Sequence, residues 1–158
     1  MSRIGFIGLN ELSESIVMAI YRTLPETQVF LYPSECSHVQ KLASVYPCWT
    51  LDNCQAVSEE SEIIILSASH CHLHSIQKSL NLRDTHTLVS LIPDVSVQQL
   101  RLSFRHAECV RMTIINQQEN SKPLVVVTEH NQRLSHFLSQ TGLCSITTSE
   151  KRFNLFIN

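Results

Sequence analysis

An apolar strand that leads through a glycine into an amphipathic helix opens the chain and constrains its fold more than any other feature. Residues 3–7 form a largely apolar segment, and Gly8 follows directly. Leu12, Ile16 and Ile20 then recur at helical spacing, which predicts a helix with one apolar face. A continuous apolar strand is typical of parallel sheets that helices cover on both faces. The opening therefore predicts an α/β fold with a mainly parallel sheet.

The same alternation of short apolar segments and amphipathic stretches continues along the chain, as in a single α/β domain. Its 158 residues suit one domain, and no linker rich in Pro, Gly or Ser divides them. The predicted strands are residues 3–7, 29–32, 48–51, 62–66, 87–91, 110–115, 124–128 and 145–148. After a first helix that ends before Pro25, the predicted helices are residues 36–44, 73–80, 97–104 and 132–140, with a weak helical turn at 52–57. We therefore predict a three-layer αβα domain over residues 1–148 and the start of a C-terminal helix over residues 149–158.

Composition and charge argue against several classes of protein. The chain has 12 Lys and Arg against 14 Asp and Glu, so it lacks the basic excess that nucleic-acid binding normally requires. The longest aliphatic runs, residues 63–66 and 124–127, fall far short of the ~20 residues that cross a bilayer. No signal-peptide core follows the N-terminus, and the six cysteines include no CxxC pair. We therefore expect a cytoplasmic protein with free thiols and with neither nucleic acid nor a membrane as partner.

The turn after the first strand occupies the place where a Rossmann-like domain binds pyrophosphate. The fingerprint G-x-G-x-x-G/A of that turn falls on Gly8, Asn10 and Ser13. Asn tolerates positive φ better than most residues, and Ser is small, so the backbone path can be kept. Asn10, however, carries a side chain where a pyrophosphate would sit, although its amide could also donate to it. The turn therefore predicts a dinucleotide site with an altered phosphate cradle.

With this turn, the chain resembles the N-terminal domain of pyrroline-5-carboxylate reductase and its relatives among the NADP and F420-dependent oxidoreductases. That family typically opens Ile-Gly-Phe-Ile-Gly-Ala-Gly-Asn-Met-Ala, which is similar to residues 4–13. Residues 61–70 are similar to its strand that ends Ala-Val-Lys-Pro, and residues 88–97 to its Ile-Ser-Ala-Ala-Gly-Val-Ser segment. The resemblance implies a Rossmann-like fold and a dinucleotide site. The residues that it places there are Gly8, Leu9, Asn10, Glu11, Leu12, Tyr32, Ser34, Ser67, Ala68, Ser69 and His70.

The sequence departs from the family in the loops that would line nicotinamide and substrate. Ser69 and His70 replace Lys-Pro, Pro93 and Asp94 stand where Ala-Gly is usual, and residues 112–117 lack the Met-Pro-Asn-Thr-Pro run. The family's C-terminal helical domain, which dimerises and supplies most of the imino-acid site, has no counterpart. We therefore predict a degenerate NAD(P)-binding domain without self-sufficient reductase activity. The alternatives are a protein-interaction or regulatory module that keeps the fold, and a domain completed by another chain.

The end of the second strand bears on cofactor choice, because an acid there binds the ribose of NAD and a basic or hydroxylic cluster binds the phosphate of NADP. Tyr32 replaces the acid, Ser34 could meet the 2′-phosphate, and the nearest cation is Lys41. NADP is therefore expected to fit slightly better than NAD.

Histidine and cysteine gather around residues 70–74 but predict no metal or catalytic site. If residues 70–74 begin a helix, only His70 and His74 share a face, and further ligands would have to come from Cys36 and His38. Cys71 stands between histidines, but sequence neighbours point apart, so no base is placed at its thiol. We interpret these histidines as solvated or helix-capping.

The last segment is too apolar to be left in water. A helix that begins near Ser149 places Phe153, Phe156 and Ile157 on one face. This face either docks on the protein's own sheet or forms a contact between chains. We expect a homodimer through this segment, because the resembled family dimerises immediately downstream.

Overall fold

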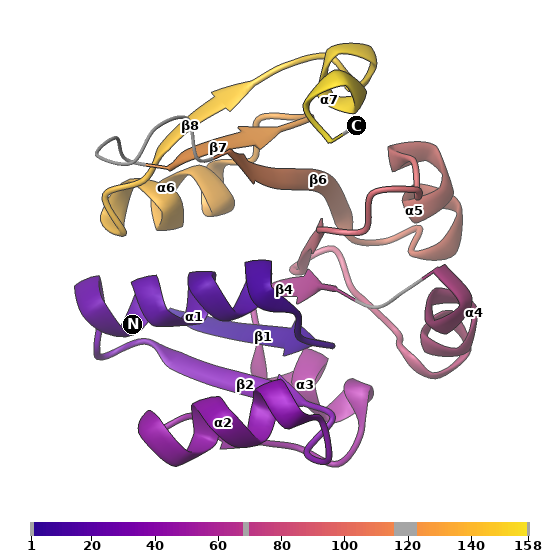
Figure 1. Cartoon of the computed structure of the whole chain (residues 1–158). Helices are drawn as coiled ribbons and strands as arrows, with labels where there is room; N and C mark the ends of the chain where they lie inside the picture. The colour runs from indigo at the N-terminus through magenta and orange to yellow at the C-terminus, as the bar shows by residue number, and fades with distance from the viewer. Residues whose placement is uncertain (1, 68–69, 116–122, 158) are drawn as a thin grey trace.

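The computed structural model describes residues 2–67, 70–115 and 123–157. Within these residues one eight-stranded sheet has the order β3-β2-β1-β4-β5-β6-β7-β8 (Figure 1). The strands are β1 (Arg3–Ile7), β2 (Gln28–Tyr32), β3 (Trp49–Thr50), β4 (Ile63–Leu66), β5 (Thr87–Ser90), β6 (Glu108–Ile115), β7 (Leu124–Val127) and β8 (Cys144–Thr147). The helices are α1 (Glu11–Thr23), α2 (Ser37–Val45), α3 (Cys54–Glu60), α4 (His70–Ser79), α5 (Val97–Ser103), α6 (Gln132–Gln140) and α7 (Glu150–Phe156).

The strands pair in parallel except at one place, where β6 meets β7 in antiparallel register. The chain runs from β1 through α1 to β2 on one side of β1, and later returns through α3 to β4 on its other side. The α/β fold with a mainly parallel sheet, predicted from the sequence, is confirmed.

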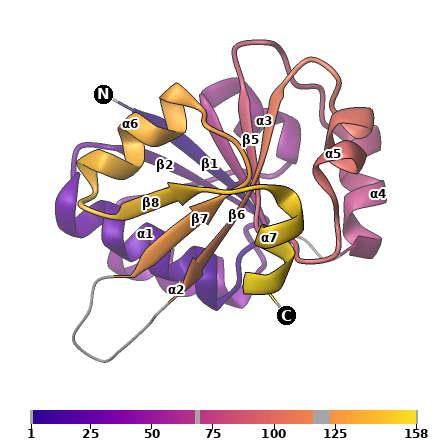
Figure 2. The ribbon, with the colours of Figure 1, turned by 90° about the horizontal axis from the view of Figure 1, so that it is seen from above.

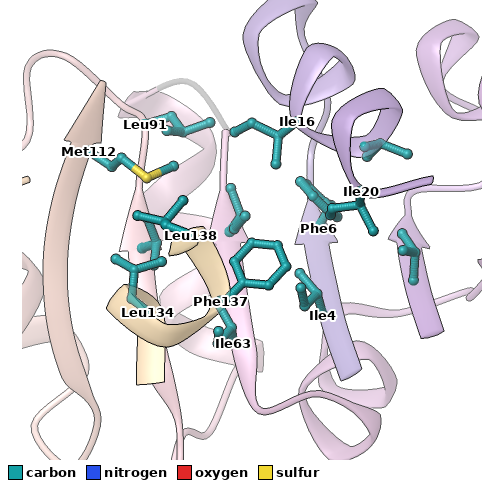
Figure 3. Close-up of a cluster of buried hydrophobic side chains, with 14 of the residues drawn as sticks. Ile4, Phe6, Ile16, Ile20, Ile63, Leu91, Met112, Leu134, Phe137 and Leu138 are labelled. Carbon is teal, nitrogen blue, oxygen red and sulfur yellow. The ribbon is translucent and has the colours of Figure 1, made fainter. Parts of the chain in front are cut away.

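Alternate side chains of the strands enter two apolar layers, one on each face of the sheet. In β4, Ile63 and Ile65 pack in the layer that contains α1, α2 and α6, and Ile64 and Leu66 in the layer that contains α3, α4 and α5. Figure 2 shows these two sets of helices on opposite sides of the sheet. Figure 3 shows the first layer, where Phe137 of α6 lies among strand side chains. An apolar strand covered on both sides is what the unbroken run of β4 predicts.

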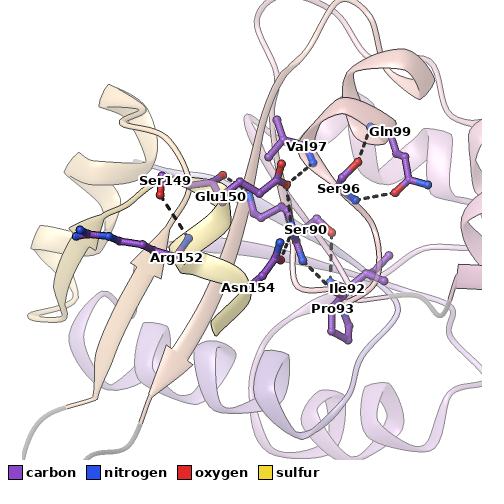
Figure 4. Close-up of polar contacts among 12 residues, drawn as sticks. Ser90, Ile92, Pro93, Ser96, Val97, Gln99, Ser149, Glu150, Arg152 and Asn154 are labelled. Carbon is purple, nitrogen blue, oxygen red and sulfur yellow. Dashed lines mark hydrogen bonds and ion pairs between the residues drawn. The ribbon is translucent and has the colours of Figure 1, made fainter. Parts of the chain in front are cut away.

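Helix α7 folds back onto the domain, and its inner face surrounds the buried guanidinium of Arg111. That guanidinium lies 4.7 Å from the centre of the Phe153 ring. Its Nη1 donates to the Glu150 carboxylate at 3.0 Å and to the Asn154 side-chain oxygen at 2.9 Å. Glu150 also accepts from the backbone N–H of Val97 at 2.7 Å, which ties α7 to the start of α5 (Figure 4). The helix thereby closes one end of its own domain.

The expectation that Phe153 lies at a contact between chains is wrong. Phe153 is 2% exposed within the single chain, so no partner can reach it. The physical reason is Arg111, a buried cation on β6 that requires a carboxylate and an aromatic face nearby. Leu155 and Phe156, 75% and 44% exposed, remain at the surface.

The described helices are all too short or too polar to span a membrane.

Candidate functional site

The carboxyl ends of β1, β2 and β4 enclose a pocket at the point where the strand order reverses. In open α/β sheets, ligands bind at such a switch point. The pocket has a volume of about 500 Å³. The described residues that line it are Ile7, Gly8, Leu9, Tyr32, Pro33, Glu35, Cys36, Ser67, Ser75 and Ile76.

Backbone hydrogen bonds hold the three strand ends together. The N–H of Gly8 donates to the Tyr32 carbonyl at 2.8 Å, and that of Ser67 to the Ile7 carbonyl at 3.0 Å. Gly8 has a φ of +76°, a left-handed conformation that residues with a Cβ rarely adopt. Gly8 therefore makes the tight turn expected of the first fingerprint glycine and brings the backbone to the wall of the pocket.

Asn10 has a different role from the one expected of the second fingerprint position. Its φ of −135° is extended, so no positive φ is required there. Its side-chain oxygen accepts from the Ser13 N–H at 3.0 Å, and the Ser13 hydroxyl accepts from the Asn10 N–H at 2.9 Å. This reciprocal capping box stabilises the start of α1. It also occupies two amide donors that a bound phosphate would otherwise attract.

The charges at the start of α1 are unfavourable for an anion. Glu11 is exposed in the first turn, where the helix dipole favours negative charge. Glu14 is buried and bonds to Lys41 Nζ and to His38 Nδ1, each at 2.7 Å. The bond to Lys41, and after it the bond to His38, lowers the pKa of Glu14 below its ordinary value. Lys41, the first Lys or Arg after β2 in the sequence, is therefore engaged by a carboxylate.

The rim beyond β2 differs from the sequence prediction. Tyr32 lines the pocket, as expected, and burial raises the pKa of its hydroxyl. Glu35 and Cys36 follow it on the rim, whereas Ser34 is not among the lining residues. The carboxylate residue Glu35 thus lines the pocket where the sequence suggested the hydroxyl of Ser34.

Ser67 offers an unused hydrogen-bonding group at the end of β4. Its hydroxyl oxygen is buried, and it has no hydrogen-bond partner among the described residues. Buried hydroxyls are normally paired, so an unpaired one on a pocket wall is a ready contact for a polar ligand.

Of the residues expected at the site, Gly8, Leu9, Tyr32 and Ser67 are brought together on the pocket wall. Asn10, Glu11 and Leu12 follow at the start of α1, outside the lining set. Ala68, Ser69 and the side chain of His70 lie outside the described residues. Sequence reasoning missed the contribution of α4, whose Ser75 and Ile76 complete the wall. No local pattern marks these two residues, because only the packing of α4 against the strand ends brings them there.

The histidines and cysteines form no metal site within the described ranges, where no group of three or more potential ligands comes together. His38 is bound to Glu14, and His74 is exposed on α4. Cys36, Cys48, Cys54, Cys109 and Cys144 are free thiols.

A larger hollow of about 710 Å³ lies beside the start of β6 and around the start of α6. Its lining includes His130, Asn131 and Arg133. Asn131 caps α6 by accepting from the Leu134 N–H, and Arg133 donates to Thr87. These groups serve the domain's own hydrogen bonds, so the switch-point pocket is the stronger candidate.

No protein-family model and no curated protein matches the sequence. Solved structures, in contrast, match nearly all of it. The 1-pyrroline-5-carboxylate reductase of Streptococcus pyogenes matches 98% of the chain with a TM-score of 0.79 and 17% identity. An imine reductase from Aspergillus terreus matches 99% with a TM-score of 0.77 and 10% identity. Prephenate dehydrogenase from A. aeolicus, solved with NAD+, matches 96% with a TM-score of 0.75 and 13% identity.

The chain spans 60–61% of the length of each of these three structures. At such low identity the likeness is one of fold. The chain therefore has the fold of pyrroline-5-carboxylate reductases and other NAD(P)-dependent reductases, over the part of those proteins that it covers.

Proposed function

We propose that the chain is a dinucleotide-binding domain of the pyrroline-5-carboxylate reductase kind, cytoplasmic, degenerate, and without self-sufficient reductase activity. The observation that carries this proposal is the switch-point pocket, with Gly8 in its left-handed turn and, on its wall, the Ser67 hydroxyl, which has no partner among the described residues. These features fit the ribose and base of a dinucleotide, which require hydrogen-bonding groups and apolar walls. A bound dinucleotide would supply hydride chemistry, and residues 1–148 would supply its binding site.

The proposed degeneracy rests on the phosphate region. The capping box of Asn10 and Ser13 occupies donors at the start of α1, and Glu11 adds negative charge beside them. A pyrophosphate therefore meets fewer amides and more repulsion than at a glycine-rich turn.

The single test is a calorimetric titration of NAD+, NADH, NADP+ and NADPH into the wild type and into Asn10→Gly. Glycine at a helix N-cap costs only a few tenths of a kcal/mol relative to Asn, so the variant should fold. We expect weak binding to the wild type and severalfold tighter binding to Asn10→Gly, because the variant frees the Ser13 N–H and removes the side chain from the phosphate cradle.

Asn53→Gly is the matched control, since Asn53 caps α3 in the same way, by accepting from the Ala56 N–H, away from the pocket. Its affinity should equal that of the wild type. If none of the four nucleotides binds to the wild type or to Asn10→Gly, the proposal is wrong.

The alternative proposal is a protein-interaction module that keeps the fold. The observation that favours it is the exposed apolar pair Leu155 and Phe156 on α7. We propose that this pair, with the half-buried Ile157, contributes to a homodimer contact. The dimer is compatible with nucleotide binding, because the pair is not among the residues that line the pocket.

A further inference from the structure

Glu35 is the one charged side chain among the described residues that line the switch-point pocket. It stands in the turn between β2 and α2, where the Cys36 N–H donates to the Pro33 carbonyl at 3.2 Å. The remaining lining is apolar or neutral: two isoleucines, a leucine, a glycine, a proline, a tyrosine, a cysteine and two serines. The pocket therefore presents a carboxylate and, in the part of the chain that the structure describes, no cation.

Two positive groups of α2 are already paired in the described part of the chain. Lys41 and His38 both bond to the buried Glu14, on the side of α2 that faces α1. The start of α1 adds the exposed carboxylate of Glu11. Within the described residues, Glu35 is thus the charged group on the pocket wall, and the cations of α2 are engaged by Glu14.

We infer that this pocket takes the unphosphorylated ribose of NAD(H), with Glu35 accepting a hydrogen bond from a ribose hydroxyl, and discriminates against the 2′-phosphate of NADP(H). The inference rests on the proposed function and specifies its ligand. A carboxylate accepts hydrogen bonds from a diol and repels a phosphate. The preference for NADP expected from the sequence rested on Ser34 and Lys41, neither of which lines the pocket.

The test compares NAD+ with NADP+, which differ only in the 2′-phosphate, by calorimetry at low salt. For the wild type we expect NAD+ to bind on the order of tenfold more tightly, the size of a like-charge repulsion at short range in a solvated site. The preference should shrink as salt is added, because the repelling groups are exposed. Glu35→Gln should reduce it to a few fold, and Glu35→Arg should reverse it.

Glu59→Gln is the matched control, the same neutralisation at an exposed glutamate of α3 that does not line the pocket. It should keep the wild-type preference. Both Glu35 variants should fold, since Glu35 is exposed.

Thiol alkylation locates the binding independently of calorimetry. Cys36 lines the pocket, and Cys144 lies exposed on β8 at the far edge of the sheet. NAD+ should slow the alkylation of Cys36 by iodoacetamide and leave that of Cys144 unchanged, as read by peptide mass spectrometry.

The outcomes separate this inference from the proposed function. If NADP+ binds the wild type as tightly as NAD+, or Glu35→Gln leaves the preference intact, the inference is wrong and the dinucleotide site stands. If neither nucleotide binds to the wild type or to Asn10→Gly, both fail together.

Discussion

Glu14 shows how a single buried carboxylate can organise the residues around it. It is 6% exposed and accepts from Lys41 and His38 of α2, so it joins the first two helices of the domain. A buried charge is tolerated when it is paired and hydrogen-bonded. Removing one partner leaves the other charge buried without compensation, which destabilises the folded state. The same pairing engages the two cations of α2 with Glu14.

Glu14 should make the stability of the domain fall in acid. Its pKa is lowered in the folded protein, so the folded state binds fewer protons and its contribution is present above the ordinary value of 4.5. That contribution is lost as the pH falls through the lowered pKa. Glu14→Gln should lose about 1–2 kcal/mol of unfolding free energy at neutral pH, since hydrogen bonds to charged groups contribute about that much when partners are exposed.

Urea unfolding between about pH 3 and pH 7, a range in which carboxyl groups titrate, measures how the unfolding free energy changes with pH. The gap between wild type and Glu14→Gln should narrow toward the acid end. Glu59→Gln, at an exposed position, should follow the wild type throughout. A gap that does not depend on pH would mean that Glu14 acts by packing alone.

At the scale of elements, α3 packs against β1 so closely that no side chain fits at Gly5. A Cβ on Gly5 would lie 2.3 Å from Val57 Cγ1 and 2.4 Å from the Ser61 hydroxyl oxygen. The Ser61 hydroxyl is itself fixed by donating to the Val57 carbonyl at 2.6 Å. Glycine at this position therefore allows the helix to pack directly on the strand that leads into the pocket.

Gly5→Ala should destabilise the domain by about 1–3 kcal/mol, the usual cost of overpacking a filled core. Thermal and urea unfolding measure the loss. Gly142→Ala is the comparison, because Gly142 has a φ of +77° and nothing within 4 Å of an added Cβ, so only backbone strain of about 1 kcal/mol applies. A smaller loss for Gly5→Ala than for Gly142→Ala would show that α3 shifts without cost.

At the scale of the whole molecule, α7 has one face inside the domain and one face outside. Phe153 and Glu150 hold it to Arg111, while Leu155 and Phe156 are left exposed at the end of the described chain. Burying two large apolar side chains contributes at most roughly 3–6 kcal/mol per chain, enough for a modest contact between copies.

The proposed homodimer predicts that Leu155→Ser with Phe156→Ser yields a monomer. Sedimentation velocity over a range of concentrations compares this variant with the wild type. Lys151→Ser with Arg152→Ser, on the same helix and also exposed, should remain dimeric. A wild type that sediments as a monomer at all concentrations would contradict the proposal.

Most of the fold could be predicted from the sequence, because the alternation of apolar runs and helical periodicity is a local property. The runs around β1 and β4 and the Gly8 turn between β1 and α1 correspond to the observed elements. The strand predicted at residues 48–51 contains the two-residue β3, but the reversed direction of β7 is not marked by any periodicity. Direction in a sheet depends on which strands pair, and pairing is decided by the folded domain.

The candidate site, like the fold, has a part that the sequence predicts and a part that only the folded domain decides. The sequence by itself determined the strand–glycine–helix turn, since that turn lies within one segment. Sequence reasoning placed Asn10 and Ser13 in a phosphate cradle, and the structure shows that they cap α1. Only the tertiary structure decided that Glu35 rather than Ser34 lines the pocket, that Ser67 has a buried hydroxyl without a partner in the described chain, and that Phe153 lies inside. Each of these facts depends on contacts between segments far apart in the sequence. No local pattern in the sequence determines which distant side chains come into contact in the folded domain.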